Sequence, residues 1–162
     1  MLYYSDHLKA VLYPDSFLEV MENVEKRHCQ TIQHFSYKCE RNRNDAGFPY
    51  GNTIPTELQF TVKLGSPDDG KVFYQQMQQN EPFDHTFIFN ATFDQNDRLS
   101  SYEDAMVVNG YVIDVEDDFT NAPTSEGSTE QMLIHVKLLV ANIAYIGVNG
   151  DRYIEISRKV SR

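Results

Sequence analysis

Three carboxylates recur two residues apart in the stretch YVIDVEDDF, residues 111–119. They are Asp114, Glu116 and Asp118, and Asp117 lies among them. Carboxylate oxygens are the ligands that Ca²⁺ and Mg²⁺ prefer, and carboxyl groups also serve as general acids and bases. On an extended strand, residues two apart are separated by about 7 Å, too far for neighbours to share one ion unless a loop curls around it. The spacing therefore favours a solvated strand face, with an ion site at these three carboxylates as the alternative.

The apolar residues of the same stretch fall on the other side of such a strand. Side chains alternate between the two faces, so the three acids share one face and the apolar residues share the opposite one. We therefore predict a buried face made of Tyr111, Ile113, Val115 and Phe119.

Two histidines and two cysteines earlier in the chain raise zinc as a second candidate metal ion. His28, Cys29, His34 and Cys39 match none of the spacings of structural zinc sites, and on a strand the cysteines would face away from the histidines. If the segment between the two cysteines is extended, they also lie too far apart to form a disulfide. We expect free thiols, which fit a reducing compartment.

Catalytic signatures are not recognisable in the sequence. It has no Gly-x-Ser-x-Gly elbow, no triad order and no Gly-rich phosphate loop. His85 and His135 lie within strand-like segments, where a histidine is more often structural than catalytic. We expect neither enzymatic activity nor a cofactor.

The charge is strongly and unevenly acidic. Fourteen Lys and Arg against 24 Asp and Glu give a net charge of −10, which argues against nucleic acid or an anionic membrane as the main partner. Residues 99–136 contain no Lys or Arg, whereas the last residues are basic, with Arg152, Arg158, Lys159 and Arg162. A chain with acidic and basic segments can pair head to tail with copies of itself, although charge runs are usually solvated faces.

The N-terminal sequence has no apolar core of a signal peptide, and no apolar run approaches the length of a membrane span. We expect synthesis in the cytoplasm, with export by a dedicated machine as an open alternative.

Strand patterns dominate the elements that must position these side chains. The stretch TELQFTVKL alternates most cleanly, with Leu58, Phe60, Val62 and Leu64 on one face. The stretch CQTIQHFSYKC also alternates, with Ile32 on one face and Thr31, Gln33, Phe35 and Tyr37 on the other.

One helix is predicted in SPDDGKVFYQQMQQN, residues 66–80. Ser66 suits the cap, Pro67 the first helical position and Asp69 the acid of a capping box. Its short apolar face would consist of Val72, Phe73, Tyr74 and Met77.

Long polar segments are predicted as loops. Residues 40–55 are rich in Asn, Gly, Pro and charge, and a loop of this length usually has a function. Its aromatic residues Phe48 and Tyr50 either fold back onto the domain or reach another subunit. Residues 120–131 also read as a flexible loop, and VNGD as a two-residue turn before a last strand, RYIEIS.

The pattern adds up to about seven or eight strands and one helix in a single domain, residues 1–162, without internal repeats. It predicts a mainly β fold, an antiparallel β-barrel or sandwich with one short α-helix.

The order of these features resembles the Hcp/TssD tube proteins of bacterial type VI secretion and, more distantly, phage tail-tube proteins. The resemblance covers roughly residues 8–147 and rests on short motifs. In the long loop they match Ser36, Tyr37, Arg41 or Arg43, Asp45, Gly47 and Pro49. Further on they match Leu99, Tyr102, Asp104 and Ala105, followed by Asp118 and Phe119.

The resemblance implies an Hcp-like β-barrel that forms hexameric rings, which stack into the inner tube of a contractile apparatus. It implies sheath and spike components and secreted effectors as further partners. It also implies assembly in the bacterial cytoplasm and secretion without a signal peptide. The loop 40–55 would contact the adjacent ring or subunit through Arg41, Arg43, Asp45, Phe48, Pro49 and Tyr50.

Two expectations stand beside the resemblance. Residues 148–162 form a hairpin extension outside it. The alternative function is a monomeric β-barrel that binds an ion or small ligand through Asp114, Glu116 and Asp118.

Overall fold

The computed structural model of the chain describes residues 10–13, 24–65, 67–124, 127–147 and 152–157. Nine strands and one α-helix lie within these ranges. The strands are β1 (Val11–Tyr13), β2 (Gln30–Arg43), β3 (Pro49–Lys63), β4 (Phe83–Phe89), β5 (Thr92–Phe93), β6 (Leu99–Ser101), β7 (Asp104–Thr124), β8 (Gly127–Ile146) and β9 (Arg152–Ser157). The helix α1 spans Lys71–Met77, and short 3₁₀ turns cover Lys26–His28 (η2) and Pro67–Gly70 (η3).

Six of the strands close into a barrel. They pair in the order β3-β2-β1-β4-β7-β8, and β8 pairs back onto β3. Each of these pairings is antiparallel. The last strand, β9, adds to β8 outside this closed order, and β5 pairs with β6 in a separate two-stranded sheet. The predicted antiparallel barrel with one short helix is confirmed, as is the final strand.

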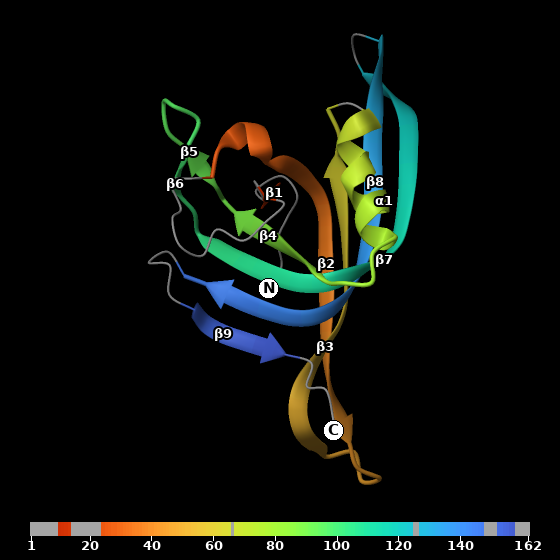
Figure 1. Cartoon of the computed structure of the whole chain (residues 1–162), viewed down its shortest axis with the longest axis vertical. Helices are drawn as coiled ribbons and strands as arrows, with labels where there is room; N and C mark the ends of the chain where they lie inside the picture. The colour runs from red at the N-terminus through yellow and green to blue at the C-terminus, as the bar shows by residue number, and fades with distance from the viewer. Residues whose placement is uncertain (1–9, 14–23, 66, 125–126, 148–151, 158–162) are drawn as a thin grey trace.

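The strands β7 and β8 each serve two parts of the barrel. The first part of β7 pairs with β4 as far as Gly110, while β8 pairs with β3 over Leu133–Leu139 and with β9 over Asn142–Ile146. Figure 1 shows both strands turning from beside β4 and β9 to run along β3. Gly110 lies at this turn, where a Cβ atom would meet the backbone oxygen of Leu139 at 2.9 Å. The close approach of the two backbones explains why glycine occupies this position.

The interior of the barrel is apolar and largely aromatic. Phe60, Phe73 and Phe87 are almost completely buried. Phe73 comes from α1, and its ring centre lies 5.7 Å from that of Phe60 in an edge-to-face arrangement. The helix therefore covers part of the barrel interior. A second, smaller cluster contains Val24, Ile88, Leu99, Tyr102, Ala105, Val107 and Ile146.

The helix is shorter than predicted and buries a different face. Residues 67–70 form the 3₁₀ turn η3, α1 begins at Lys71, and Ser66 lies outside the described residues. Phe73 is buried as expected, but Met77 is 39% exposed and Gln76 is buried instead. The prediction for Met77 is wrong because Gln76, and not Met77, points into the barrel, where its side chain forms a hydrogen bond with His85.

A bulge in β2 changes the face on which its residues lie. Ile32 pairs with Val62 and His34 with Thr61, so Gln33 is an extra residue in the ladder. An extra residue reverses the alternation beyond it. Phe35 consequently packs into the same core as Ile32, and the prediction that the two lie on opposite faces is wrong.

A second bulge acts in the same way in β7. Val112 pairs with Leu138 and Asp114 with Lys137, which leaves Ile113 as the extra residue. Val112 is buried and Val115 is half-buried, whereas Tyr111 is 38%, Ile113 45% and Phe119 56% exposed. The predicted buried face is therefore wrong for Tyr111 and Ile113. It is also wrong for Phe119, which lies beyond the bulge and is exposed independently of it.

Most of the predicted loop 40–55 is a β-hairpin, which we call the arm. Glu40 pairs with Ile54, Asn42 with Tyr50 and Arg43 with Pro49, so only residues 44–48 form a turn. Figure 1 shows the arm extending away from the barrel. The loop prediction is wrong because two polar segments on either side of a tight turn can pair through their backbones. Composition does not reveal such pairing.

The predicted loop 120–131 is also mostly paired backbone. The strand β7 continues to Thr124 and β8 begins at Gly127, and their register runs to the pair Thr124–Gly127. The predicted turn VNGD lies outside the described residues.

Candidate functional site

Hydrogen bonds within the turn hold the tip of the arm. The Asn44 side-chain oxygen accepts hydrogen bonds from the backbone N–H groups of Ala46 and Phe48, both at 3.0 Å. Gly47 and Gly51 have φ values of 87° and 74°, which side-chain-bearing residues rarely adopt. The amino-acid types in this segment thus suit a hairpin tip.

The side chains of the arm point into solvent on both faces. All residues from 41 to 51 are exposed, with Phe48 at 66% and Tyr50 at 53%. An isolated two-stranded hairpin is only marginally stable in water. The exposed aromatics therefore favour a partner that covers the arm.

The charged residues of the arm are available for external contacts. Arg41 donates from Nε to the backbone oxygen of Gly51 at 3.2 Å, and Lys38 at the base pairs with Glu40 at 2.5 Å. The side chains of Arg43 and Asp45 have no hydrogen bond or ion pair with another described residue. The six predicted contact residues, Arg41, Arg43, Asp45, Phe48, Pro49 and Tyr50, are thus gathered in one protruding hairpin.

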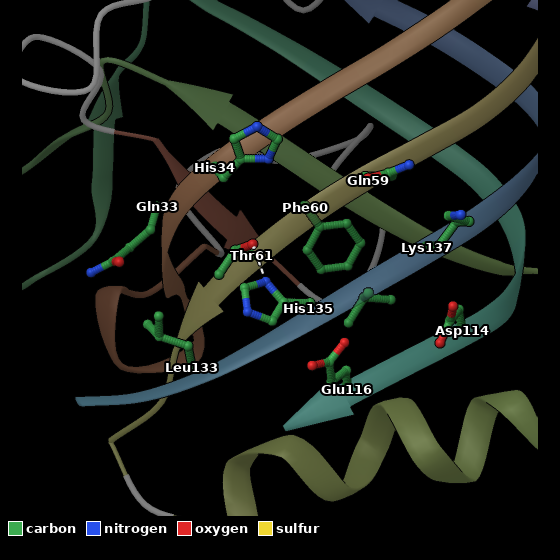
Figure 2. Close-up of a pocket in the computed structure, with 11 residues that line it drawn as sticks. Gln33, His34, Gln59, Phe60, Thr61, Asp114, Glu116, Leu133, His135 and Lys137 are labelled. Atoms are coloured by element: carbon green, nitrogen blue, oxygen red, sulfur yellow. Dashed lines mark hydrogen bonds between the residues drawn. The ribbon is translucent and has the colours of Figure 1, made fainter. Parts of the chain in front are cut away.

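A groove of about 600 Å³ crosses the outer face of the barrel over β2, β3, β8 and β7. We call the surface of these four strands that lines the groove the outward face. One row across it contains His34, Thr61, His135 and Glu116, and the next contains Ser36, Gln59, Lys137 and Asp114. Figure 2 shows Asp114 and Glu116 on β7 beside Lys137 and His135 on β8. The bulge at Ile113 is what places these two acids in these rows.

His135 connects three strands at the centre of the groove. Its Nδ1 lies 2.7 Å from Thr61 Oγ1, the dashed line in Figure 2, and its Nε2 lies 3.3 Å from Asp118 Oδ2. A hydroxyl, imidazole and carboxylate in a row are the parts of a nucleophilic triad. Thr61, however, lies in a strand paired on both sides and is only 7% exposed. We interpret the row as a cross-strand hydrogen-bond network.

The four acids of residues 114–118 have different surroundings. Asp117 accepts a hydrogen bond from Tyr74 Oη at 2.9 Å, and Asp118 contacts His135. The side chains of Asp114 and Glu116 are exposed and have no hydrogen bond or ion pair with a described residue. In the described ranges, no three His, Cys, Asp or Glu side chains gather closely enough to hold a metal ion. The structure therefore does not bring Asp114, Glu116 and Asp118 together as an ion site.

Sequence reasoning missed one near-match to a phosphate-binding loop. The segment GSPDDGKV, residues 65–72, has the glycine and lysine spacing of that loop but Val72 in place of Ser or Thr. The Asp69 carboxylate accepts the Gly65 N–H at 3.2 Å, which places a negative charge where a phosphate would bind. This segment is unsuited to phosphate.

A buried polar pair between α1 and β4 was also missed from the sequence. His85 is 1% exposed, and its Nε2 lies 3.0 Å from Gln76 Oε1. Burial lowers the pKa of His85 to about 4, so the imidazole is neutral at pH 7. Its Nδ1 is buried without a hydrogen-bond partner. No local signal in the sequence distinguishes this histidine from an exposed one.

Both cysteines are free, as predicted. Burial raises the pKa of the Cys29 thiol to about 11, and its Sγ donates to the Glu25 backbone oxygen at 3.5 Å. Burial also raises the pKa of Cys39. Both thiols are therefore poor nucleophiles.

A helix long and apolar enough to cross a membrane is not found in the part of the chain that the structure describes.

No protein-family model matches the chain, and no curated protein matches it. Solved structures do match over nearly their whole length. An Hcp protein aligns at 12% identity and a TM-score of 0.65, covering 95% of this chain and 99% of the other.

Two further Hcp structures align similarly. The Hcp1 protein from the E. coli EAEC 042 pathovar has 13% identity and a TM-score of 0.59, covering 93% of this chain and 98% of the other. Hcp1 from Flavobacterium johnsoniae has 11% identity and a TM-score of 0.56, covering 92% and 98%. The chain therefore has the fold of the Hcp proteins, which its sequence motifs resemble.

Proposed function

We propose that this chain is a structural tube subunit, which assembles into hexameric rings that stack into the inner tube of a type VI secretion or related contractile injection apparatus. The fold supports this proposal, because one matching structure is described as a type six secretion system protein and another as the secreted protein Hcp3 of Pseudomonas aeruginosa. Self-assembly requires no catalytic residue.

The observation that carries the proposal is the exposure of the arm. A hairpin whose aromatic and arginine side chains are exposed on both faces is expected to be buried by another molecule. Arginine and tyrosine are favoured contact residues in protein interfaces. In the proposed tube, the arm contacts the adjacent ring or subunit through Arg41, Arg43, Asp45, Phe48, Pro49 and Tyr50.

Partners and a cellular location follow from the proposed tube. The tube subunit would be made in the bacterial cytoplasm, contact sheath and spike components, carry effectors in the lumen and leave the cell with the tube. No cofactor enters this function.

The mass of the particle in solution tests the proposal. Native mass spectrometry and light scattering should give about six times the protomer mass of 18.7 kDa, and electron microscopy should show rings or stacks. A protein that stays monomeric at high concentration contradicts a tube subunit.

A second measurement tests the arm. The double variant Phe48→Ser/Tyr50→Ser should lose stacked rings because it removes the exposed aromatics. Met77→Ser on α1, which also removes a partly exposed apolar side chain, should stack normally. Equal stacking of both variants would contradict the role of the arm.

A further inference from the structure

His85 on β4 supports both side chains that α1 places inside the barrel. Its Nε2 lies 3.0 Å from Gln76 Oε1, and its ring stacks on that of Phe73 with an interplanar angle of 17°. Gln76 and Phe73 are the buried residues of α1. One imidazole is therefore the common support of the inward face of the helix.

A further contact of α1 lies at the surface. Tyr74 Oη donates an exposed hydrogen bond to Asp117 Oδ2 on β7 at 2.9 Å. Water competes for both groups, so this hydrogen bond adds little net stability. A helix of seven residues is also too short to persist in water without packing. The position of α1 therefore depends on its interior contacts at His85 and Phe73.

The hydrogen bond to Gln76 fixes which nitrogen of His85 carries the proton. An amide oxygen can only accept, so Nε2 donates and Nδ1 is left with its lone pair. Nδ1 is buried and has no hydrogen-bond partner among the described residues. A second proton would have to go to this nitrogen, where an unpaired buried charge is costly.

The polar groups of β4 reduce this cost without cancelling it. The Asp84 carboxylate and the Phe83 backbone oxygen favour the charged imidazole, but burial outweighs both and lowers the pKa of His85 to about 4. The Asp84 carboxylate also accepts a hydrogen bond from Asn109 Nδ2 on β7 at 2.8 Å. At neutral pH the imidazole therefore stays uncharged beneath the helix.

The other elements packed against His85 present apolar or neutral groups to it. From β3, the Phe60 ring lies with its centre 6.2 Å from that of the imidazole, and β7 places Val108 opposite His85 in the ladder. On α1, Lys71 is exposed, and the Tyr74 hydroxyl is bonded to β7. A charge on His85 is thus relieved only by contact with water.

The strand that carries His85 is held in place without the helix. His85 pairs with Val108 of β7, and the next residue, Thr86, pairs with Tyr13 of β1. The barrel closes through the pairing of β3 with β8, which does not include α1. The helix can therefore leave while the six strands stay paired.

We propose that α1 is an acid-released cover of the barrel, which leaves its seat when His85 gains a second proton while the six strands of the barrel stay paired. The charge favours release because water reaches Nδ1 only after Phe73 and Gln76 have moved away. Release uncovers the aromatic interior at Phe60, on which Phe73 packs. It does not require assembly, because each of these contacts lies within one chain.

Hydrogen exchange at two pH values, followed by mass spectrometry on the full chain, measures the release. The imidazole has a pKa of about 4 when covered and the ordinary value of 6.5 when hydrated, so the released fraction rises as the pH falls. From pH 7.5 to pH 5, protection factors of amides in α1, corrected for intrinsic exchange at each pH, should fall roughly thirtyfold. Those of residues 58–62 in β3 and 134–138 in β8 should change less than about threefold.

Two histidine variants assign the release to His85. His85→Gln cannot titrate and keeps an amide that can bond to Gln76, so its α1 protection should not depend on pH. His34→Gln removes an exposed histidine of β2 and should keep the thirtyfold fall. Circular dichroism checks the fold of each variant.

Gln76→Leu keeps the test decisive if His85→Gln does not fold. It removes the hydrogen bond and retains the titrating group, so α1 should be less protected than in the wild type at both pH values, with the same dependence on pH. Wild-type α1 protection that is unaffected by pH, or that falls in parallel with β3 and β8, overturns the proposal. So does a pH dependence that survives in His85→Gln, or wild-type protection of α1 in Gln76→Leu.

Discussion

His85 on β4 and Gln76 on α1 form a hydrogen bond inside the barrel, with 3.0 Å between Nε2 and Oε1. His85 also stacks on Phe73, with ring centres 6.4 Å apart and an interplanar angle of 17°. The helix is thus attached to the barrel by a neutral imidazole that acid would charge. Several measurable properties depend on this pair and on the backbone geometry around it.

Acid should destabilise the protein through His85. Its pKa is lowered from 6.5 to about 4 by burial, so between these values the unfolded chain binds the proton more readily than the folded chain. The folded state is therefore not penalised by His85 above about pH 6.5, and its free energy of unfolding decreases as the pH falls from 6.5 towards 4. Urea unfolding should show a loss of about 2–3 kcal/mol between pH 7 and pH 4.5 from this group.

Two variants assign the effect to this histidine. His85→Gln cannot titrate and should flatten the pH dependence over that range, whatever its stability at pH 7. His34→Gln changes an exposed histidine and should keep the wild-type slope. A slope that persists in His85→Gln would mean that other groups cause it.

Phe73→Ala should lower the free energy of unfolding by about 3–5 kcal/mol, because it removes a buried ring and leaves a cavity against Phe60 and His85. Met77→Ala on the same helix should cost less than about 1 kcal/mol, since that side chain is 39% exposed. Equal costs in urea unfolding would contradict the observed orientation of α1.

Gly110→Ala should lower the free energy of unfolding by about 1–3 kcal/mol. The new Cβ would lie 2.9 Å from the Leu139 backbone oxygen, so β7 and β8 would have to separate where they turn. Ser36→Ala, at an exposed position of β2, should remain within about 0.5 kcal/mol of the wild type. An unchanged midpoint for Gly110→Ala would show that the two strands are farther apart than described.

The Cys29 thiol should react slowly with iodoacetamide. With a pKa of about 11 instead of 9.0, its thiolate fraction at pH 8 is about a hundredfold smaller than in the unfolded chain. The Cys39→Ser variant isolates this thiol, and mass spectrometry follows its alkylation with and without urea. Similar rates in both conditions would show that Cys29 is not protected.

Millimolar Ca²⁺ or Mg²⁺ should leave the melting temperature unchanged. A ligand of the folded state would raise it, but Asp114, Glu116 and Asp118 are not gathered around a common point. A melting temperature that rises with cation in the wild type, and not in Asp114→Asn/Glu116→Gln, would restore the ion-site alternative.

Alternation predicted one strand well and two strands poorly. Leu58, Phe60, Val62 and Leu64 were expected on one face and are all buried, because β3 pairs without interruption with β8 along this length. In β2 the alternation was read correctly only up to Gln33, and in β7 the predicted buried face was correct for Val115 but wrong for Tyr111 and Ile113 before it. An extra residue in a ladder has no signature in local composition, so the reversal of faces beyond it could not be predicted.

The candidate sites also divide into features that the local sequence predicts and features that depend on contacts between strands. The exposure of the acids at 114 and 116 and of the polar residues of the arm was expected from residue types, because charge and turn propensity are local properties. The row from His34 to Glu116 could not be identified, since it joins two hairpins, β2–β3 and β7–β8, that are distant in the chain. The Gln76–His85 pair was missed although its residues are close in the chain, because the packing of α1 against β4 has no local signal.

The sequence by itself determined that the chain is mainly β, that it has one short helix and that its acids cluster in residues 114–118, since these follow from alternation, capping residues and composition. Only the tertiary structure decided which side chains of β2 and β7 are buried and which acids line the groove. The physical reason is that closing and bending the barrel requires bulges and a close backbone approach at Gly110, and these depend on the partner strands.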